Sequence, residues 1–570
     1  MDATAAVSEF SAATRSFSSV TRSLGPDWIA PAVQSIPWAG RQYAATRALA
    51  SIGLDGSVAG LELAEALRES PAASTAASPT GRLGALLSTG RKHIDTALAS
   101  LSDASSRADA LSADGLAPPL ASAVRSVQAA LRAATPFLGR SHALLQLESY
   151  LLSGNHRLLV VSQDGAELRP TGGFAGSFGI VNVGPTGVQL EKYQDVYVLP
   201  DPPGRVPQPT GMLVGRNDFK FRDANWWIDF PTSARAMLGF WRTYNQPPVD
   251  GIIAVDTVAM RDLLAALGPV RVPSYNETFT AKNLLQRLLY LVEVKPMSQS
   301  DNKAVLTALA AELEKRVLGA KPDELAKAAL ALGKAADAKH VQMYFTNPDA
   351  QAAAEQLGWS GRVLPPAGTT DVVAISNAMN QPGKVNIALK KTIDYRVLLQ
   401  PDRSADTTLV LGYANTGAYP LPWSSVFRDW LRVYRAPGTV FPGTTTSGGK
   451  TVTMVEFGFP AEARTFALSH GQIRSETLTA RVPEAMHTAS TPAATSGDAH
   501  YQLYLVRQAD LEDIPTTITV TAPSGWRVIS ANAWLTASGA PLPVTSEQER
   551  VRMAFPLSGD TALDVRLATF

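Results

Sequence analysis

Apolar residues along the first 150 positions recur at helical spacing, and this spacing predicts an α-helical region there. The stripes are carried by Val58, Leu61, Ala64 and Leu67, by Ile94, Leu98 and Leu101, and by Val124, Val127, Leu131 and Leu138. Asp55 is a candidate N-cap for the first stripe, and Pro118-Pro119 separates two later segments. We expect a helical hairpin or small bundle over residues 1–150, serving either as a spacer or as a partner-binding coiled coil.

The pattern changes near residue 155, where short apolar runs alternate with helical segments. Expected strands lie at 157–162, 178–183, 188–193, 251–255, 341–345 and 372–375, and expected helices at 230–244, 257–267, 280–292 and 301–335. Pro231 suits the first turn of one helix, and Asp256 is a candidate cap for the next. Alternating strands and helices predict a three-layer α/β domain over residues 151–384.

From about residue 385 the hydrophobic period becomes two, which is typical of strands with one buried face. The alternation runs through Ile393, Tyr395, Val397 and Leu399, and again through Leu409, Leu411 and Tyr413. Short strands separated by turns predict one or two β-sandwich modules over residues 385–570. The whole chain is therefore expected to be multi-domain, with a helical bundle, an α/β domain and all-β sandwich modules.

Composition excludes several classes of protein. Lys and Arg number 51 against 50 Asp and Glu, so the chain lacks the basic excess that nucleic-acid binding requires. It has no cysteine, which excludes disulfides, thiolate metal sites and cysteine nucleophiles. No run of ~18 apolar residues marks a membrane span. A chain whose membrane anchor precedes residue 1 would look the same.

The densest group of functional residue types joins the first two expected strands. Glu167, Arg169 and Thr171 stand beside the glycine pair Gly172-Gly173. Glycines let backbone amides approach an anion, and an arginine binds phosphate or carboxylate with its planar fork. The alternative is a glycine-rich crossover in which Glu167 and Arg169 form a local ion pair.

A second group precedes the expected helix at 230–244. Its members are Arg222, Asp223, Asn225, Trp226, Trp227 and Asp229. Asp229 either contributes to a site or caps the helix, and the tryptophans are either core residues or a wall for a sugar ring. Asp195 and Asp256 end expected strands, where open α/β sheets tend to bind ligands, although Asp256 also fits a helix cap.

The strings Glu167-Leu-Arg-Pro-Thr-Gly-Gly-Phe174, Arg222-Asp-Ala-Asn-Trp226, Asp229-Phe-Pro-Thr-Ser-Ala234 and Val249-Asp-Gly-Ile-Ile-Ala-Val-Asp256 occur in this order. They resemble the bacterial domain-of-unknown-function family DUF4012 over about 155–385. The resemblance implies an extracytoplasmic cell-surface protein held to the membrane by an anchor that is not present in this chain.

The order of elements is also distantly similar to the LytR–CpsA–Psr (LCP) family, which transfers glycopolymers from prenyl-pyrophosphate lipid to the cell wall. Gln194-Asp195-Val-Tyr197 resembles that family's Arg-Asp-Thr-Tyr string, and Asn225 matches its Lys-Ile-Asn-Ala string. The segment from Val249 to Val270 resembles its strand–helix segment. Gln194 replaces an arginine of the transferases, and Glu293-Val-Lys295 stands where they carry Arg-x-Arg.

Three functions remain open. The first is a non-catalytic envelope protein that binds a glycan or envelope partner proteins. The second is a phosphotransferase acting on prenyl-pyrophosphate-linked glycopolymer, with catalytic residues Arg169, Asp195, Arg222 and Asp223 and ligand-binding residues Glu167, Thr171, Gly172, Gly173, Asn225 and Trp226. There the arginines would hold pyrophosphate oxygens, and Asp195 and Asp223 would bind Mg²⁺ or deprotonate the acceptor. The third is a cytosolic scaffold.

Overall fold

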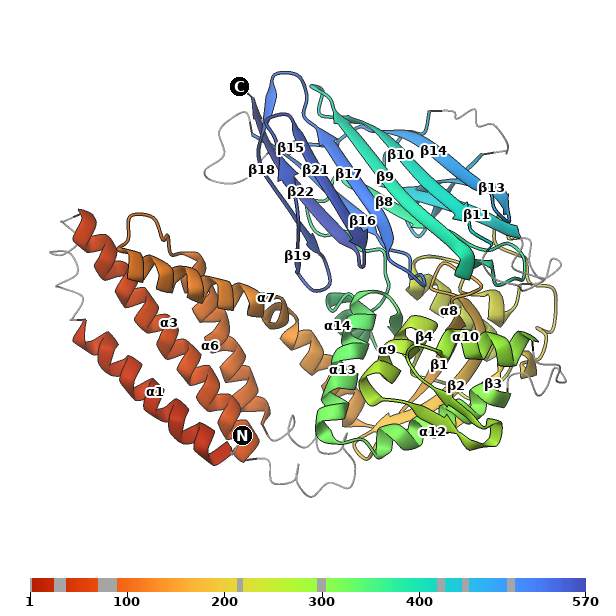
Figure 1. Cartoon of the computed structure of the whole chain (residues 1–570), viewed down its shortest axis with the longest axis horizontal. Helices are drawn as coiled ribbons and strands as arrows, with labels where there is room; N and C mark the ends of the chain where they lie inside the picture. The colour runs from red at the N-terminus through yellow and green to blue at the C-terminus, as the bar shows by residue number, and fades with distance from the viewer. Residues whose placement is uncertain are drawn as a thin grey trace. The chain divides into compact units, whose positions relative to one another are not determined.

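The computed structural model describes residues 3–24, 37–69, 90–212, 219–294, 304–417, 426–442, 451–488 and 498–569. The chain divides into two compact units, one made of residues 1–155 with 183–188 and the other of residues 156–182 with 189–570. The first unit is helical, and the second contains a central α/β region followed by a β-rich region (Figure 1). This order of helical, α/β and β-rich regions confirms the coarse prediction.

The helical unit contains α1 (Ala3–Ser23), α3 (Pro37–Arg68), α6 (Arg91–Asp109) and α7 (Pro118–Ser153). Small buried residues let the helices pack closely, and a Cβ on Gly53 of α3 would lie only 2.3 Å from the Phe17 ring of α1. The predicted cap at Asp55 is wrong, because Asp55 lies inside α3, where it pairs with Arg107 of α6 at 3.0 Å. Within the described residues, we find no helix with the length and apolar character needed to cross a bilayer.

The α/β region is built on a five-stranded sheet with the order β3-β2-β1-β4-β7. Its strands are β1 (His156–Asp164), β2 (Phe174–Gly184), β3 (Gly187–Asp195), β4 (Gly251–Asp256) and β7 (Val341–Phe345). β1 and β4 are parallel, with Leu158 opposite Gly251, whereas β4 and β7 are antiparallel. The carboxyl ends of β1 and β4 therefore meet at one edge of the sheet.

Helices cover both faces of this sheet, as three-layer packing requires. Ile252 and Ala254 of β4 pack in the same core as α8 (Phe230–Thr243), while Ile253 and Val255 pack with α9 (Thr257–Leu267) and α13 (Pro322–Asp337). Alternate side chains of a strand point to opposite faces, so one strand serves both cores. The remaining elements are α10 (Leu284–Leu289), α12 (Ala304–Leu318), α14 (Pro348–Gln356) and the hairpin of β5 (Val270–Val272) and β6 (Glu277–Phe279).

The β-rich region consists of two sheets. The six-stranded sheet has the order β14-β10-β9-β17-β21-β20, and the nine-stranded sheet has the order β12-β13-β11-β8-β16-β22-β18-β19 with β15 paired to β16. The bounds are β8 (Asp371–Ser376), β9 (Leu389–Leu399), β10 (Ala405–Asn415), β11 (Val426–Arg435), β12 (Val452–Glu456), β13 (Phe459–Ser469), β14 (Ile473–Val482), β15 (His487–Thr488), β16 (Ala499–Val506), β17 (Ile514–Thr521), β18 (Trp526–Leu535), β19 (Pro541–Leu542), β20 (Thr545–Ser546), β21 (Arg550–Leu557) and β22 (Thr561–Thr569).

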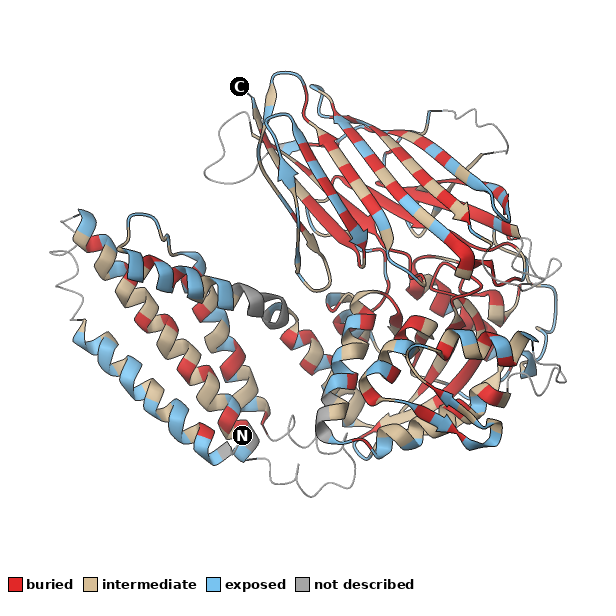
Figure 2. Ribbon diagram, in the orientation of Figure 1, coloured by how far each residue is buried: buried red, intermediate tan, exposed pale blue. Residues whose placement is uncertain are grey.

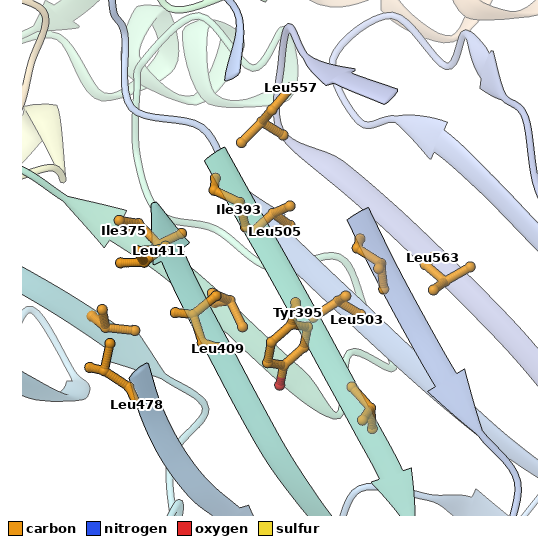
Figure 3. Close-up of a cluster of buried hydrophobic side chains, with 14 of the residues drawn as sticks. Ile375, Ile393, Tyr395, Leu409, Leu411, Leu478, Leu503, Leu505, Leu557 and Leu563 are labelled. Atoms are coloured by element: carbon orange, nitrogen blue, oxygen red, sulfur yellow. The ribbon is translucent and has the colours of Figure 1, made fainter. Parts of the chain in front are cut away.

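The two sheets share one hydrophobic core. Ile393 and Leu409 of the six-stranded sheet lie in the same buried cluster as Leu503 and Leu505 of the nine-stranded sheet (Figure 3). Buried residues alternate with more exposed ones along β9 and β10, as the period of two predicted (Figure 2). Burial of one face of each sheet against the other is thus the main source of stability in this region.

One expected strand belongs to a different sheet from the one predicted. The sequence pattern places residues 372–375 in the α/β domain, but β8 pairs with β11 and β16 in the nine-stranded sheet. All six residues of β8 are buried, so its apolar run carries no alternation that could indicate which sheet it joins. The β-rich region therefore begins before residue 385.

Candidate functional site

The segment between β1 and β2 requires glycine at two positions, because its backbone packs closely against neighbouring atoms. Gly172 has a φ of +123°, a conformation that favours glycine. A Cβ on Gly173 would lie 2.3 Å from the carbonyl oxygen of Asp164, so no larger residue fits at this position. Both glycines are explained by the tight crossover between two strands without invoking a bound anion.

Arg169 is held inside the protein by an ion pair and a backbone contact. Its side chain is 1% exposed, and its Nη2 donates a hydrogen bond to Glu167 Oε1 at 2.9 Å. Its Nη1 donates to the carbonyl of Met379, which lies just beyond β8. The local ion pair, one of the two interpretations of this segment, is therefore present. By its hydrogen bond to Met379, Arg169 also attaches the α/β region to the β-rich region.

Lys384 completes this buried charge cluster. Its Nζ lies 2.8 Å from Asp164 Oδ2, 3.4 Å from Glu167 Oε2 and 3.6 Å from Glu293 Oε1. Burial alone would lower the pKa of Lys384, but the three carboxylates outweigh it and hold the pKa above its ordinary value. Sequence reasoning missed this residue because it lies more than 200 positions beyond Asp164 and Glu167, and no local pattern marks it.

Asn225 and Trp226 are wholly buried structural residues. Asn225 Nδ2 donates to Thr171 Oγ1 at 3.1 Å and to the carbonyl of Gly173 at 2.6 Å, and this ties the second group of residues to the glycine segment. The carbonyl of Trp226 accepts a hydrogen bond from Arg432 of β11, whose guanidinium lies 5.1 Å from the indole centroid. The interpretation of Trp226 as a core residue is confirmed.

Arg222 and Asp195 lie nearer the surface, whereas their neighbour Asp223 is buried. Asp195 caps the short 3₁₀ turn Val196–Val198, accepting from the Tyr197 amide at 3.0 Å. The Arg222 guanidinium lies over the Tyr197 ring, 5.0 Å from its centroid, and Tyr197 is 60% exposed. Arg222 Nε also lies 3.9 Å from Asp223 Oδ2. These contacts form an aromatic and charged surface, hereafter the Tyr197 surface, defined by Asp195, Tyr197 and Arg222, with the buried Asp223 next to Arg222.

Charged groups of the buried cluster affect the pKa values of Tyr197 and Asp223. Burial raises the pKa of the Asp223 carboxyl, and the positive charges of Arg169 and Arg222 act against this rise. Burial also raises the pKa of the Tyr197 phenol. The negative charges of Glu167, Asp195 and Asp223 raise this pKa further, whereas Arg222 lowers it. The structure thus brings the candidate residues into one neighbourhood, with Arg169 buried and Arg222 and Asp195 only partly so. A cavity of about 570 Å³ lies elsewhere, and none of these residues lines it.

The Mg²⁺ site expected at Asp195 and Asp223 does not fit the surroundings of these carboxylates. Among the described residues, no three His, Asp or Glu side chains come close enough together to hold a metal. Burial raises the pKa of the Asp223 carboxyl and Arg222 Nε lies 3.9 Å from its Oδ2, whereas Mg²⁺ prefers ionised oxygen ligands without a competing cation.

Asp229 and Asp256 both act as helix caps, which confirms that interpretation of each. Asp229 Oδ2 accepts from the Thr232 amide at 3.1 Å at the start of α8, and Oδ1 accepts from the Val363 amide at 3.1 Å. Asp256 Oδ1 accepts from the amides of Val258 and Ala259 at the start of α9. Each carboxylate thereby accepts hydrogen bonds from backbone N–H groups that have no partner within the first turn of the helix.

Replacing Asp229 with alanine is expected to lower the free energy of unfolding by about 1–2 kcal/mol, because the α8 cap is lost. Urea unfolding followed by circular dichroism measures the change. Asp262→Ala, which removes a partly exposed carboxylate within α9, is the control and should change stability by less than about 0.5 kcal/mol. Equal effects of the two substitutions would contradict the assignment of Asp229 as a cap.

A buried histidine links the second helix cap to the β-rich region, and the sequence did not single it out. His340 Nδ1 lies 2.6 Å from Asp256 Oδ2, and its Nε2 lies 3.2 Å from Arg507 Nη2. Arginine can only donate, so His340 Nε2 accepts and Nδ1 carries the proton. Arg507 also donates to Asp513 Oδ1 at 2.9 Å. These contacts are a second polar junction between the two regions.

Comparison with known protein families gives a match over part of the chain. Residues 153–292 match the family described as "Protein of unknown function (DUF4012)", which confirms the resemblance over that segment. No curated protein matches the chain. Among solved structures, the Lin1025 protein from Listeria innocua shares 14% identity over 36% of this chain and 78% of its own, with a TM-score of 0.21. An M1 zinc metallopeptidase from Deinococcus radiodurans shares 15% identity over 31% of this chain and 42% of its own, with a TM-score of 0.17.

Proposed function

We propose, taking the membership of residues 153–292 in DUF4012 as the premise, that this chain is a non-catalytic surface protein of the bacterial cell envelope that binds a glycan or a partner protein. The envelope location is carried over from the family resemblance. In this proposal the α/β and β-rich regions form a single binding unit, because buried polar contacts attach one region to the other.

The internal use of Arg169 is the observation that carries the proposal. Binding a diphosphate would require an arginine whose donors are free to reach the ligand. Arg169 instead pairs with Glu167, donates to the Met379 carbonyl and is 1% exposed. Gln194 replaces a further arginine of the transferases, and Lys295 of the Glu293–Lys295 segment lies outside the described residues. An arginine that fixes two regions together is not available to hold a transferring phosphoryl group.

The Tyr197 surface is the place where we expect a glycan to bind. An exposed aromatic ring can stack on the apolar face of a sugar, while neighbouring charged groups bind its hydroxyls. Tyr197 is 60% exposed, and the Arg222 guanidinium makes a cation–π contact with its ring. Asp195 adds a carboxylate acceptor beside the ring.

Replacing Tyr197 with alanine is expected to weaken glycan binding about tenfold, which corresponds to ~1.4 kcal/mol for one lost stacking contact. Isothermal titration of the full chain with solubilised peptidoglycan fragments measures the affinity. Tyr290 supplies a matched control, because it is also exposed and carries Arg287 4.9 Å from its ring centroid. If Tyr290→Ala weakens binding as much as Tyr197→Ala, or if the unaltered chain binds no fragment, the assignment of the Tyr197 surface fails.

The phosphotransferase, together with the LCP-like fold it would require, is the second candidate. One observation favours it: Asp223 is a buried carboxyl of raised pKa beside Arg222 and Arg169, as a general base for a hydroxyl would be. In that reaction the acceptor hydroxyl oxygen would form a bond to the sugar-linked phosphorus. The bond from this phosphorus to the bridging oxygen would break, prenyl phosphate would leave, and Asp223 would take the hydroxyl proton.

Incubation of the full chain with a prenyl-pyrophosphate-linked glycan and an acceptor glycan separates the two candidates. We expect no release of prenyl phosphate. Release that is lost in both Asp223→Asn and Arg222→Ala, with circular dichroism spectra unchanged, would establish the transferase and overturn the non-catalytic proposal.

A further inference from the structure

The cavity of about 570 Å³ lies within the second unit, between its α/β and β-rich regions. One wall comes from α9 and the segment around α10, and the other comes from β9, residues 510–513 and the start of β17. The volume falls within the range of pockets that bind small molecules. The cavity contains none of the residues that the proposed function uses, so it stands independently of that proposal.

Much of the cavity lining is apolar. Side chains from both walls contribute to it: Val258, Leu285, Ile387, Leu389, Leu511 and Ile514. Leu511 also packs against the turn after β1, because a Cβ on Gly165 would lie 2.7 Å from its Cδ2. Apolar surface that is held open between two packed regions gains free energy when an apolar ligand displaces water from it.

The charges on the β-rich wall are already neutralised. Lys390 Nζ lies 2.5 Å from Glu512 Oε2, Lys391 pairs with the buried Asp510, and Asp513 accepts from Arg507. Each acid of this wall therefore has a basic partner. None of these acids is left to repel an anion or to attract a cation.

The α/β wall differs because it carries an uncompensated positive charge. Arg261 pairs with its neighbour Asp262 at 3.0 Å. Lys282 is exposed at the cavity, and in the part of the chain that the structure describes no carboxylate lies within ion-pair distance of it. The remaining charge at the cavity is thus the ammonium group of Lys282, beside an apolar interior.

We propose that this cavity binds an amphipathic organic anion, with its apolar body against Leu285 and Leu511 and its acidic group at Lys282. The acidic group is a carboxylate or phosphate, and its source is either a soluble metabolite or a lipid. A ligand of this kind satisfies both features of the site, since a purely apolar ligand would leave Lys282 unpaired and inorganic phosphate would leave the apolar lining wet.

Fluorescence titration of the full chain with 8-anilinonaphthalene-1-sulfonate, an amphipathic anion, tests the proposal. We expect saturable binding at one site. Leu285→Trp, which fills the cavity, and Lys282→Glu, which reverses the unpaired charge, should each weaken it about tenfold. Lys334→Glu is the matched control, because this lysine is an exposed residue of α13 that does not line the cavity. It should leave the affinity unchanged.

Competition identifies the class and source of the ligand. Decanoate should displace the probe, whereas inorganic phosphate should not. Co-sedimentation with phosphatidylglycerol vesicles that Leu285→Trp abolishes would identify a lipid source, and displacement by decanoate without co-sedimentation would identify a soluble one. The proposal is overturned if the folded chain does not bind the probe, if Lys282→Glu binds it as the unaltered chain does, or if Lys334→Glu weakens binding equally.

Discussion

Replacing Arg169 with methionine is expected to lower the free energy of unfolding by about 3–5 kcal/mol, because it leaves a buried carboxylate without its main partner. Glu167 is only 5% exposed, and the remaining cation near it, Lys384, lies 3.4 Å away and also serves two other acids. The substitution also removes the hydrogen bond to the Met379 carbonyl, which joins the α/β and β-rich regions. Urea unfolding at neutral pH measures the loss.

Two further variants determine what the result means. Arg481→Met removes a surface arginine, 44% exposed, that pairs with Asp402 and Asp406, and it should cost less than about 1 kcal/mol. The double variant Glu167→Gln with Arg169→Met should lose less stability than the sum of the two single variants, because the two side chains interact directly. A stable Arg169→Met chain with unchanged unfolding would refute the structural role and restore Arg169 as a candidate ligand-binding residue.

The second large effect concerns Asp429 of β11, whose carboxyl is buried in the β-rich region. Burial raises its pKa to about 7, although Asn377, Lys391 and Arg432 act against this rise. Its Oδ2 accepts from Asn377 Nδ2 at 2.5 Å, and its Oδ1 has no hydrogen-bond partner among the described residues. The native state therefore holds a proton that the unfolded chain releases near pH 4.

Because the pKa is raised in the folded state, the stabilisation from Asp429 is fully present below pH ~4. It is lost as the pH rises through about 7. The shift of about three units corresponds to ~4 kcal/mol. Asp429→Asn is neutral at every pH, so we expect it to be more stable than the unaltered chain at pH 8, by up to ~4 kcal/mol, and about equally stable near pH 4.

Urea unfolding of both proteins at several pH values between 4 and 8 measures this difference. Other titrating groups contribute equally to the two chains and cancel in the comparison. Asp406→Asn, which alters a carboxylate that is 49% exposed, should follow the pH profile of the unaltered chain. A constant difference between Asp429→Asn and the unaltered chain across this range would show that Asp429 is ionised throughout.

Several elements could be predicted because their signals are local. α8 begins where Asp229 and Pro231 indicated, and β4 and α9 follow one another at the Asp256 cap. The period of two correctly identified β9 and β10. In each case the pattern reflects which face of one short segment is buried, and neighbouring residues in the sequence carry that information.

The sequence by itself thus determined the order of helical, α/β and β-rich regions and the residue types gathered around Arg169. Only the tertiary structure decided that β8 joins the nine-stranded sheet and that Arg169 reaches Met379, 210 positions away. It alone also placed Lys384 among three acids and Lys282 at an apolar cavity. The physical reason is that a charged side chain acquires its role from the groups that share its desolvated surroundings, and those groups come from distant segments whose meeting no local pattern records.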